Sequence, residues 1–107
     1  MIDHVTIRVS DVEKSKAFYE ATLQPLGYKH AFGQVGAFHA FDIGQGLFEI
    51  MQAEARKVET STHVALRVAD EGGVESFYNA AVEAGGRDNG APGPRPDYTN
   101  TYYACFT

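Results

Sequence analysis

The stretch DHVTIRVSD, residues 3–11, is followed 59 positions later by THVALRVAD, residues 62–70. Five of the nine positions are identical, and they include a histidine, an arginine and an aspartate. Further identities follow at the same spacing without a gap: Phe18-Tyr19 with Phe77-Tyr78, Ala21 with Ala80, and Gly27 with Gly86. Self-similarity at a fixed spacing indicates an internal duplication. We therefore expect two copies of one unit, with any activity located where the copies face each other.

Length and composition predict one globular domain that contains both copies. The chain has 107 residues, of which 44% are hydrophobic and 21% charged, as in an ordinary soluble domain. The duplication divides this domain into repeats of about residues 1–53 and about residues 61–107, with a polar connector between them. The formal net charge is −5 and the Lys and Arg residues are scattered, which argues against a nucleic acid or an anionic membrane as partner.

Cysteine usage and the start of the chain bear on the compartment. Cys105 is the only cysteine, which excludes an internal disulfide framework and a cysteine-rich metal site. The first residues lack the basic and then apolar pattern of a signal peptide. No apolar run approaches the roughly 20 residues that a membrane-spanning helix needs. We expect a cytoplasmic protein in which Cys105 is a buried strand thiol.

Each copy begins with a pattern that predicts a strand. In the first copy Val5, Ile7 and Val9 alternate with His4, Thr6 and Arg8. In the second copy Val64, Leu66 and Val68 alternate with His63, Ala65 and Arg67. The aliphatic side of each strand suits packing on a helix. The other side carries a histidine, a small residue and an arginine, which suits a cavity better than a core.

A helix is predicted after each of these strands. Ser10 or Asp11 is a suitable N-cap, and Glu13 lies three residues after Ser10, as in a capping box. In the second copy, apolar residues from Val74 to Val82 follow helical spacing. Gly27 and Gly85-Gly86 are predicted to end the two helices.

Short strands are expected after each helix, and here the copies differ. The first copy has candidates at about 28–33, 37–43 and 46–52, separated by glycines. The second has a candidate near 87–88 and one at about 99–106. Residues 89–96 between them are rich in Gly and Pro and predict either a mobile lid or a rigid connector. The second copy has no counterpart of 46–52, so its fourth strand is missing from this sequence.

A duplicated βαβββ unit with an early histidine in each copy resembles the vicinal oxygen chelate superfamily. That superfamily includes glyoxalase I, extradiol dioxygenases, methylmalonyl-CoA epimerase and the bleomycin and fosfomycin resistance proteins. Three segments carry the resemblance most specifically: Asp3-His4-Val5, the run from Ser10-Asp11 to Phe18-Tyr19, and Thr62-His63-Val64. Residues 84–96 are also similar to uncharacterised bacterial glyoxalase-like members. The resemblance implies an α+β fold in which paired βαβββ modules form a curved mixed sheet around a cavity, with helices outside.

The resemblance also implies a metal site. Metal-dependent members take ligands from the first and last strands of each unit, which here correspond to His4, Glu49 and His63, plus a carboxylate on the missing strand. Such a mixed N/O set suits Zn, Ni, Mn, Fe or Co without choosing among them. One copy of this chain supplies at most three of the ligands. Either the sequence is truncated, or a partner chain completes the site, and we expect a homodimer.

Several residues have a functional and a purely structural interpretation side by side. By strand parity Glu49 shares its side with Leu47 and Met51, so it is either a ligand or general base or lies at a solvent-exposed strand end. Arg8 and Arg67 could bind an anionic substrate group or form internal ion pairs. His39 and Tyr103 align across the copies and are candidate substrate contacts. Tyr98 and Tyr102 are further candidates for the cavity wall, and His30 is expected at the surface.

These residues lead to three functional hypotheses. The first is a metal-dependent lyase, isomerase or ring-cleaving dioxygenase, in which Glu49 is catalytic and a small oxygenated substrate chelates the ion. The second is a metal-free protein that binds and sequesters a small compound, as resistance proteins do. The third is a truncated member that has lost its activity.

Overall fold

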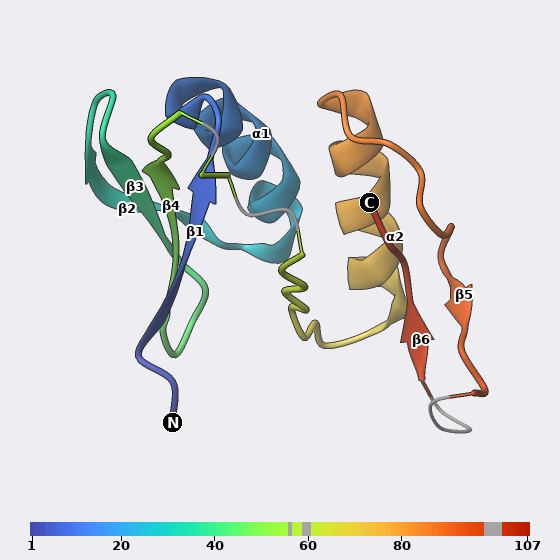
Figure 1. The fold of residues 1–107 in the computed structure, drawn as a ribbon. Helices are drawn as coiled ribbons and strands as arrows, with labels where there is room; N and C mark the ends of the chain where they lie inside the picture. The colour runs from blue at the N-terminus through green and yellow to red at the C-terminus, as the bar shows by residue number, and fades with distance from the viewer. Residues whose placement is uncertain (56, 59–60, 98–101) are drawn as a thin grey trace.

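A computed structural model of the chain describes residues 1–55, 57–58, 61–97 and 102–107. The elements follow one another along the chain as shown in Figure 1: β1 (His4–Val9), α1 (Val12–Leu23), the 3₁₀ helix η1 (Gln24–Leu26), β2 (Lys29–Gln34), β3 (Phe38–Asp42), β4 (Leu47–Gln52), α2 (Glu71–Glu83), β5 (Gly93–Pro94) and β6 (Tyr103–Ala104). The chain is therefore α+β, as the sequence predicts, and its first unit is a complete βαβββ module.

The first unit forms a mixed four-stranded sheet in the order β1-β4-β3-β2. Strands β1 and β4 are parallel, and the other two pairs are antiparallel. The predicted strands 28–33, 37–43 and 46–52 are confirmed to within one residue at each end. Because β4 lies between β1 and β3, the first strand of this unit has the fourth strand as its partner.

One face of this sheet packs on α1 and forms the core. The fully buried cluster consists of Val12, Leu23, Phe41, Phe48 and Ile50. Tyr19 of α1 packs against it, with its ring centroid 4.9 Å from that of Phe48. The aliphatic side of β1 faces the same way, since Ile7 and Val9 also pack against the cluster. The predicted division of β1 into an apolar and a polar side is confirmed.

The helix ends show which predicted caps form. Asp11 is the N-cap of α1, and its Oδ1 accepts a hydrogen bond from the backbone N–H of Lys14 at 3.1 Å. The capping box with Ser10 and Glu13 is wrong, because Glu13 reaches across to the sheet instead. Gly27 ends η1 in the left-handed region at φ 79°, a conformation that favours glycine.

The second unit forms its helix but not its sheet. Asp70 caps α2 by accepting a hydrogen bond from Gly73 N at 2.8 Å. The strand predicted at 62–68 is wrong, since none of these residues belongs to a strand. In the first unit this strand pairs with the fourth one, and the 107 residues contain no counterpart of β4 in the second unit. An extended segment without a partner has no ladder of hydrogen bonds to hold it.

The rest of the second sheet is reduced to a short ribbon. The strand predicted near 87–88 does not form, and the one at 99–106 is limited to the two residues of β6 within the described part. Residues 98–101, which include the predicted Tyr98, lie outside the described residues. Strand β6 pairs with β5, which falls inside the predicted loop 89–96.

The side chain of Arg95 stabilises the loop 89–96 through hydrogen bonds and a ring contact. Its guanidinium donates to the carbonyl of Gly93 at 2.9 Å and to that of Ala91 at 2.8 Å, and it lies 5.3 Å from the ring centroid of Phe106. The backbone of Phe106 also exchanges hydrogen bonds with Asn89 and Gly90. These contacts favour the rigid connector over the mobile lid.

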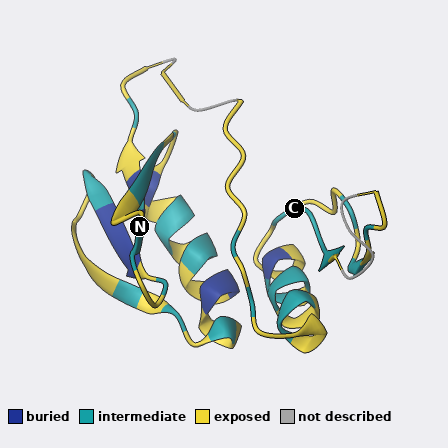
Figure 2. Ribbon diagram, turned by 90° about the horizontal axis from the view of Figure 1, so that it is seen from below, coloured by how far each residue is buried: buried dark blue, intermediate teal, exposed yellow. Residues whose placement is uncertain are grey.

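The two units pack helix against helix. Helix α1 contacts α2, and η1 also contacts α2. Figures 1 and 2 show the four-stranded sheet on one side of this helical pair and the β5–β6 ribbon on the other. Among the described residues, one chain therefore does not form the expected cavity between two facing sheets, and no described helix or strand packs on the sheet face away from α1. Within the described part, no helix is long and apolar enough to cross a membrane.

Candidate functional site

The open face of the four-stranded sheet carries several of the polar residues that the sequence singled out. Strand β1 contributes His4, Thr6 and Arg8, because alternate residues of a strand share a face. The parallel register places Thr6 beside Glu49 and Arg8 beside Met51. The sheet thus brings together three of the predicted site residues, His4, Arg8 and Glu49, on one surface.

Glu49 is held in place on this face. The hydroxyl of Thr6 donates a hydrogen bond to Glu49 Oε1 at 2.9 Å, and the Glu49 side chain is half-buried. Across the antiparallel pair, Glu49 lies opposite Ala40, whose small side chain is fully buried. A half-buried carboxylate is costly without a donor, and Thr6 supplies one.

His4 lies near this carboxylate at the start of β1. Its Nδ1 is 2.9 Å from Asp3 Oδ1. The hydrogen bond with Asp3 and the negative charge of Glu49 both raise the pKa of His4 above its ordinary value. The ring is about half exposed, so it remains accessible to a ligand. His4 and Glu49 together form a donor and an acceptor at one end of the open face.

The three predicted metal ligands are not assembled by one chain. In the described ranges, no group of three or more His, Cys, Asp or Glu side chains is placed to hold an ion. His63 is exposed on the unpaired segment of the second unit, where its ring makes an edge contact with Phe106 at 6.3 Å. The described residues of one chain therefore do not fit a complete metal centre. His4 supplies one nitrogen donor and Glu49 one carboxylate donor.

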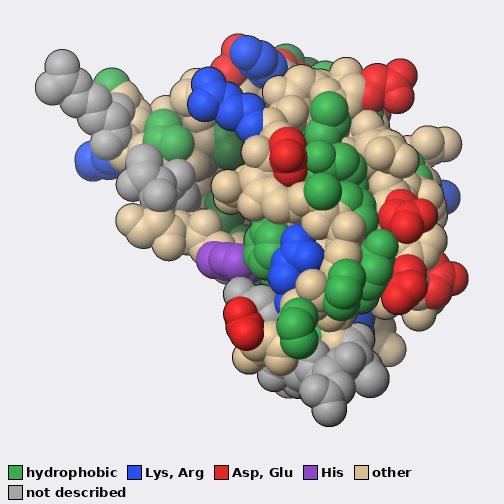
Figure 3. Space-filling model, turned by 90° about the vertical axis from the view of Figure 1, so that its right-hand side faces the viewer, with side chains coloured by type: hydrophobic (Ala, Val, Ile, Leu, Met, Phe, Trp, Pro, Cys, Tyr) green, Lys and Arg blue, Asp and Glu red, His purple; other side chains and the backbone are tan. Residues whose placement is uncertain are grey.

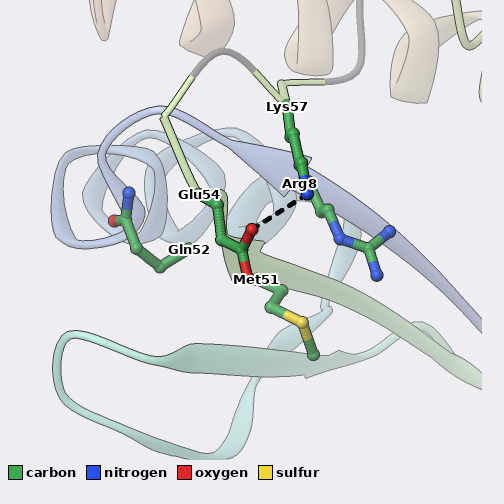
Figure 4. Close-up of a pocket in the computed structure, with 5 residues that line it drawn as sticks. All are labelled: Arg8, Met51, Gln52, Glu54 and Lys57. Atoms are coloured by element: carbon green, nitrogen blue, oxygen red, sulfur yellow. Dashed lines mark hydrogen bonds and ion pairs between the residues drawn. The ribbon is translucent and has the colours of Figure 1, made fainter.

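A cavity lies at the other end of the same face, where β1 and β4 finish. It has a volume of about 420 Å³, which is within the usual range for small-molecule sites. Arg8, Met51, Gln52, Glu54 and Lys57 line it (Figure 4). Lys57 Nζ lies 3.0 Å from Glu54 Oε2, so these two side chains form an ion pair at the rim.

The remaining predicted contacts of the second unit lie elsewhere. Arg67 is exposed on the unpaired segment. The Tyr103 hydroxyl donates to Glu75 Oε1 at 3.2 Å, and partial burial together with this carboxylate raises the pKa of Tyr103. Tyr102 is exposed. These residues belong to the α2 and β6 side of the molecule, so one chain does not bring them to the open sheet face.

His39 occupies the opposite face of the sheet from Glu49. The register pairs His39 with Ile50, so its side chain points toward α1, and it is only 3% exposed. His39 Nε2 lies 2.7 Å from Glu13 Oε2, and its Nδ1 lies 2.9 Å from His30 Nε2. The expectation that His39 lines the same cavity as Glu49 is corrected, and His30, which was expected at the surface, is half-buried beside it.

This Glu13–His39–His30 network is the feature that sequence reasoning missed. Glu13 also accepts a hydrogen bond from Gly36 N at 2.9 Å, and these two contacts lower the pKa of Glu13. Burial and the charge of Lys16 lower the pKa of His30. The run Phe38-His39-Ala40-Phe41 has an aromatic residue on both sides of the strand, so its parity alone does not tell which side is buried.

Comparisons with known proteins agree with this architecture. A model of the Glyoxalase/Bleomycin resistance protein/Dioxygenase superfamily matches residues 1–107. A search of curated proteins found no match.

Solved structures are similar in fold. A glyoxalase/bleomycin resistance protein from Albidiferax ferrireducens T118 superposes with a TM-score of 0.82 at 24% identity, over 96% of this chain and 86% of that one. A family enzyme from Burkholderia phytofirmans PsJN gives 0.63 at 23% identity, over 88% and 82%. The fosfomycin resistance protein FosX from Listeria monocytogenes, complexed with Mn(II) and a dihydroxypropylphosphonic acid, gives 0.64 at 19% identity, over 89% and 71%. With its complete βαβββ unit and its match over the full length, the chain belongs to the Glyoxalase/Bleomycin resistance protein/Dioxygenase superfamily.

Proposed function

We propose that the open face of the four-stranded sheet binds a small oxygen-bearing molecule at His4, Thr6 and Glu49. The observation that carries this proposal is the Thr6–Glu49 hydrogen bond of 2.9 Å beside His4, on a sheet face over which no other described helix or strand packs. A polar pair fixed by packing and register on a rigid sheet is suited to orient a ligand.

The three side chains have complementary roles. Glu49 uses one oxygen to accept from Thr6, and its other oxygen can accept a ligand hydroxyl or a proton. His4 has a raised pKa, so its protonated form donates to a ligand oxygen over a wider pH range than a free histidine. The site can therefore bind a molecule that carries both a hydroxyl and a carbonyl or ether oxygen.

The proposal is tested by a ligand-observed NMR screen of small oxygenated fragments, followed by the same hits on two variants. Glu49→Gln removes the acceptor charge at the site. Glu83→Gln makes the same change at an exposed position of α2 and is the matched control. We expect hits on the wild type and on Glu83→Gln that weaken strongly on Glu49→Gln. Equal binding by all three proteins would place the site elsewhere.

A metal-dependent enzyme is the second candidate, because His4 and Glu49 are two suitable donors and FosX was solved with Mn(II). In this form His63 of a second copy would supply a third donor, and Glu49 would be the catalytic carboxylate of a lyase, isomerase or dioxygenase. Elemental analysis after incubation with mixed divalent metals and desalting tests it. Near-stoichiometric metal that is lost in His63→Asn supports this candidate, and no retained metal rejects it.

A homodimer fits the open surfaces of the chain. The uncovered sheet face and the outer edge of β1 leave room for the second unit of another copy, which would bring His63, Arg67 and Tyr103 toward the site as predicted from the sequence. Light scattering on the purified protein distinguishes a dimer from a monomer. We also propose that the protein works in the cytoplasm, which cell fractionation tests.

A further inference from the structure

Three titratable side chains on the α1 side of the sheet form one continuous chain of hydrogen bonds. Glu13 Oε2 lies 2.7 Å from His39 Nε2, and His39 Nδ1 lies 2.9 Å from His30 Nε2. The backbone N–H of Gly36 donates to the same Glu13 oxygen at 2.9 Å. These contacts connect α1 with β3, with the edge strand β2 and with the turn between the two strands.

The β2–β3 hairpin is shaped so that the two histidines can meet. The register shifts between His30 and Phe32, which marks a β-bulge. Because His30 pairs with Phe41 and Gly33 pairs with His39, the bulge puts His30 and Gly33 on the side of the sheet that faces α1. A Cβ at position 33 would clash with His39 Nδ1, the atom that meets His30. Glycine at this position therefore leaves the space that the contact needs.

The carboxylate of Glu13 determines which ring nitrogens carry protons. Hydrogen bonds from Gly36 and His39 lower the pKa of Glu13, and an ionised carboxylate only accepts hydrogen bonds. His39 Nε2 is then the donor, which leaves Nδ1 of a neutral His39 to accept from His30 Nε2. His30 Nδ1 has no partner among the described residues. Because no buried polar side-chain atom of these residues lacks a partner, this nitrogen reaches solvent.

We propose that this chain of hydrogen bonds is a two-proton switch that holds β2 on β3 at neutral pH and releases it in acid. A first proton binds at His30 Nδ1 and leaves all three hydrogen bonds in place. The ring nitrogen that remains for a second proton is His39 Nδ1. A proton there sets two N–H donors of two cationic rings against each other at 2.9 Å, so the contact between the histidines breaks.

Neighbouring charged groups set the pH at which the first proton binds. Burial and the positive charge of Lys16 lower the pKa of His30, whereas the carboxylates of Glu20 and Glu13 oppose this effect. Lys16 and Glu20 also pair with each other on α1 at 2.8 Å. His39 is the titratable neighbour from β3. In the opened hairpin both rings take up protons near the ordinary histidine pKa of about 6.5, so acid favours the opened form.

Opening changes the surface of the sheet because β2 is an edge strand. The ring of His30 makes an edge contact with that of Phe41 at 5.6 Å, and Phe41 is fully buried. Release of β2 uncovers Phe41 and the outer edge of β3, and an uncovered edge is a template for another strand. The switch lies on the α1 side of the sheet, so it does not depend on the proposed binding face on the other side.

The test is NMR spectroscopy of the ¹⁵N-labelled protein between pH 7.5 and 5. We expect a scalar coupling between His30 Nε2 and His39 Nδ1 at pH 7.5, because this coupling arises only across an N–H···N hydrogen bond. The coupling should survive protonation of His30 Nδ1 and disappear when His39 is protonated. At that step the protection of the β2 amides against hydrogen exchange should fall by about ten-fold per pH unit, the factor for each further proton taken up on opening.

Three variants distinguish this switch from a single titrating histidine. His30→Gln should lose the fall in protection, because the amide can turn to accept from a protonated His39. His39→Gln should lose most of it, because the amide donates to Glu13 and accepts from His30 whatever the charge of that ring. Lys16→Gln removes a cation that opposes charge on His30, so it should move the first protonation to higher pH and keep the coupling. Circular dichroism at pH 7.5 confirms that each variant is folded.

Three results would overturn the switch. Absence of the coupling at pH 7.5 would remove the hydrogen bond on which it depends. A coupling and a β2 protection that both persist to pH 5 would show that protons do not open the hairpin. A fall in protection that is unchanged in His39→Gln would assign the pH dependence to His30 alone. None of these results bears on the proposed binding face, which the fragment screen tests separately.

Discussion

The two units begin with nearly the same sequence and reach different structures. Residues 4–9 form β1 in a four-stranded sheet, whereas residues 63–68, with four of six positions identical, form no strand. The difference lies at the other end of each unit. Strand β4 sits between β1 and β3 in the first unit, and the second unit has no counterpart of it within the 107 residues. An alternating pattern specifies which side of a strand is apolar, but the strand forms only beside a partner.

The two units also differ in how deeply their residues are buried. The fully buried cluster is drawn entirely from α1, β3 and β4, and the second unit adds half-buried residues such as Leu66 and Phe77. Figure 3 shows the side of the molecule formed by the second unit, where a band of hydrophobic side chains is exposed next to acidic ones. Val82 and Tyr102 each remain about 40% exposed, at 42% and 41%. We infer that the first unit dominates the stability of the chain.

Core truncations should show this division most strongly. Phe41 is fully buried, so Phe41→Ala should lower the free energy of unfolding by about 3–5 kcal/mol. Phe77→Ala, the same type of change in the second unit, should lower it by about 1–2 kcal/mol, because Phe77 is only half-buried. Urea denaturation followed by circular dichroism measures both. Equal losses would show that the two units contribute equally.

The hydrogen bond beneath the candidate site offers a matched pair of smaller changes. Thr6→Val keeps the shape of the side chain but deprives Glu49 of its donor, and should cost about 1–2 kcal/mol. Ala65 is the counterpart of Thr6 in the second unit and is exposed, so Ala65→Val should be nearly neutral. The same denaturation measurement compares them. A neutral Thr6→Val would mean that solvent satisfies Glu49 equally well.

Arg95 should matter locally in the second unit. Arg95→Gln removes the ring contact with Phe106 and the donors to two carbonyls, which we expect to cost about 1 kcal/mol. Hydrogen exchange should become faster at the amides of Asn89 and Phe106 and stay unchanged in β3. Unchanged exchange at Asn89 and Phe106 would show that the prolines, and not Arg95, hold the loop.

The histidine network should make the stability of the first unit depend on pH. The pKa of His30 is lowered in the folded state, so the unfolded chain binds a proton more readily near its ordinary value of about 6.5. This contribution is present above pH ~6.5 and is lost as the pH falls through the lower folded pKa. The Glu13 contribution, whose pKa is also lowered, disappears at still lower pH.

Unfolding measured from pH 7.5 to 5 tests this expectation. His30→Gln should flatten the loss of stability over this range, because the amide hydrogen-bonds but does not titrate. A pH profile that is identical in the wild type and in His30→Gln would reject the role of His30.

Much of this structure could be predicted from the sequence, and the exceptions share a cause. The caps Asp11 and Asp70, the stop at Gly27 and the strands of the first unit follow from local rules. Whether His39 faces α1 depends on which of its aromatic neighbours this helix covers. Whether residues 63–68 form a strand depends on a partner strand. Both are tertiary effects, and local patterns do not determine them.

In the candidate site too, local patterns predict some of the placements and tertiary packing determines the others. Strand parity correctly places His4 and Arg8 on one face of β1, because alternate residues share a side, and the pairing of β1 with β4 brings Glu49 to the same face. The expected meeting of His4 and His63 depends on how the two units pack, and in one chain they pack through α1 and α2. The contact of Glu13 with His39 could not be predicted, because a glutamate at this position is equally typical of a capping box.

The measurement that tests the central claim most directly is the mapping of amide shifts with the tightest fragment from the ligand screen. We expect the fragment to shift the amides of residues 4–8 and 47–51 of the first unit and to leave residues 63–68 and α2 unaffected in the monomer. In Glu49→Gln the shifts at residues 4–8 and 47–51 should disappear. Shifts centred on residues 63–68 or on α2, or shifts unchanged in Glu49→Gln, would contradict it.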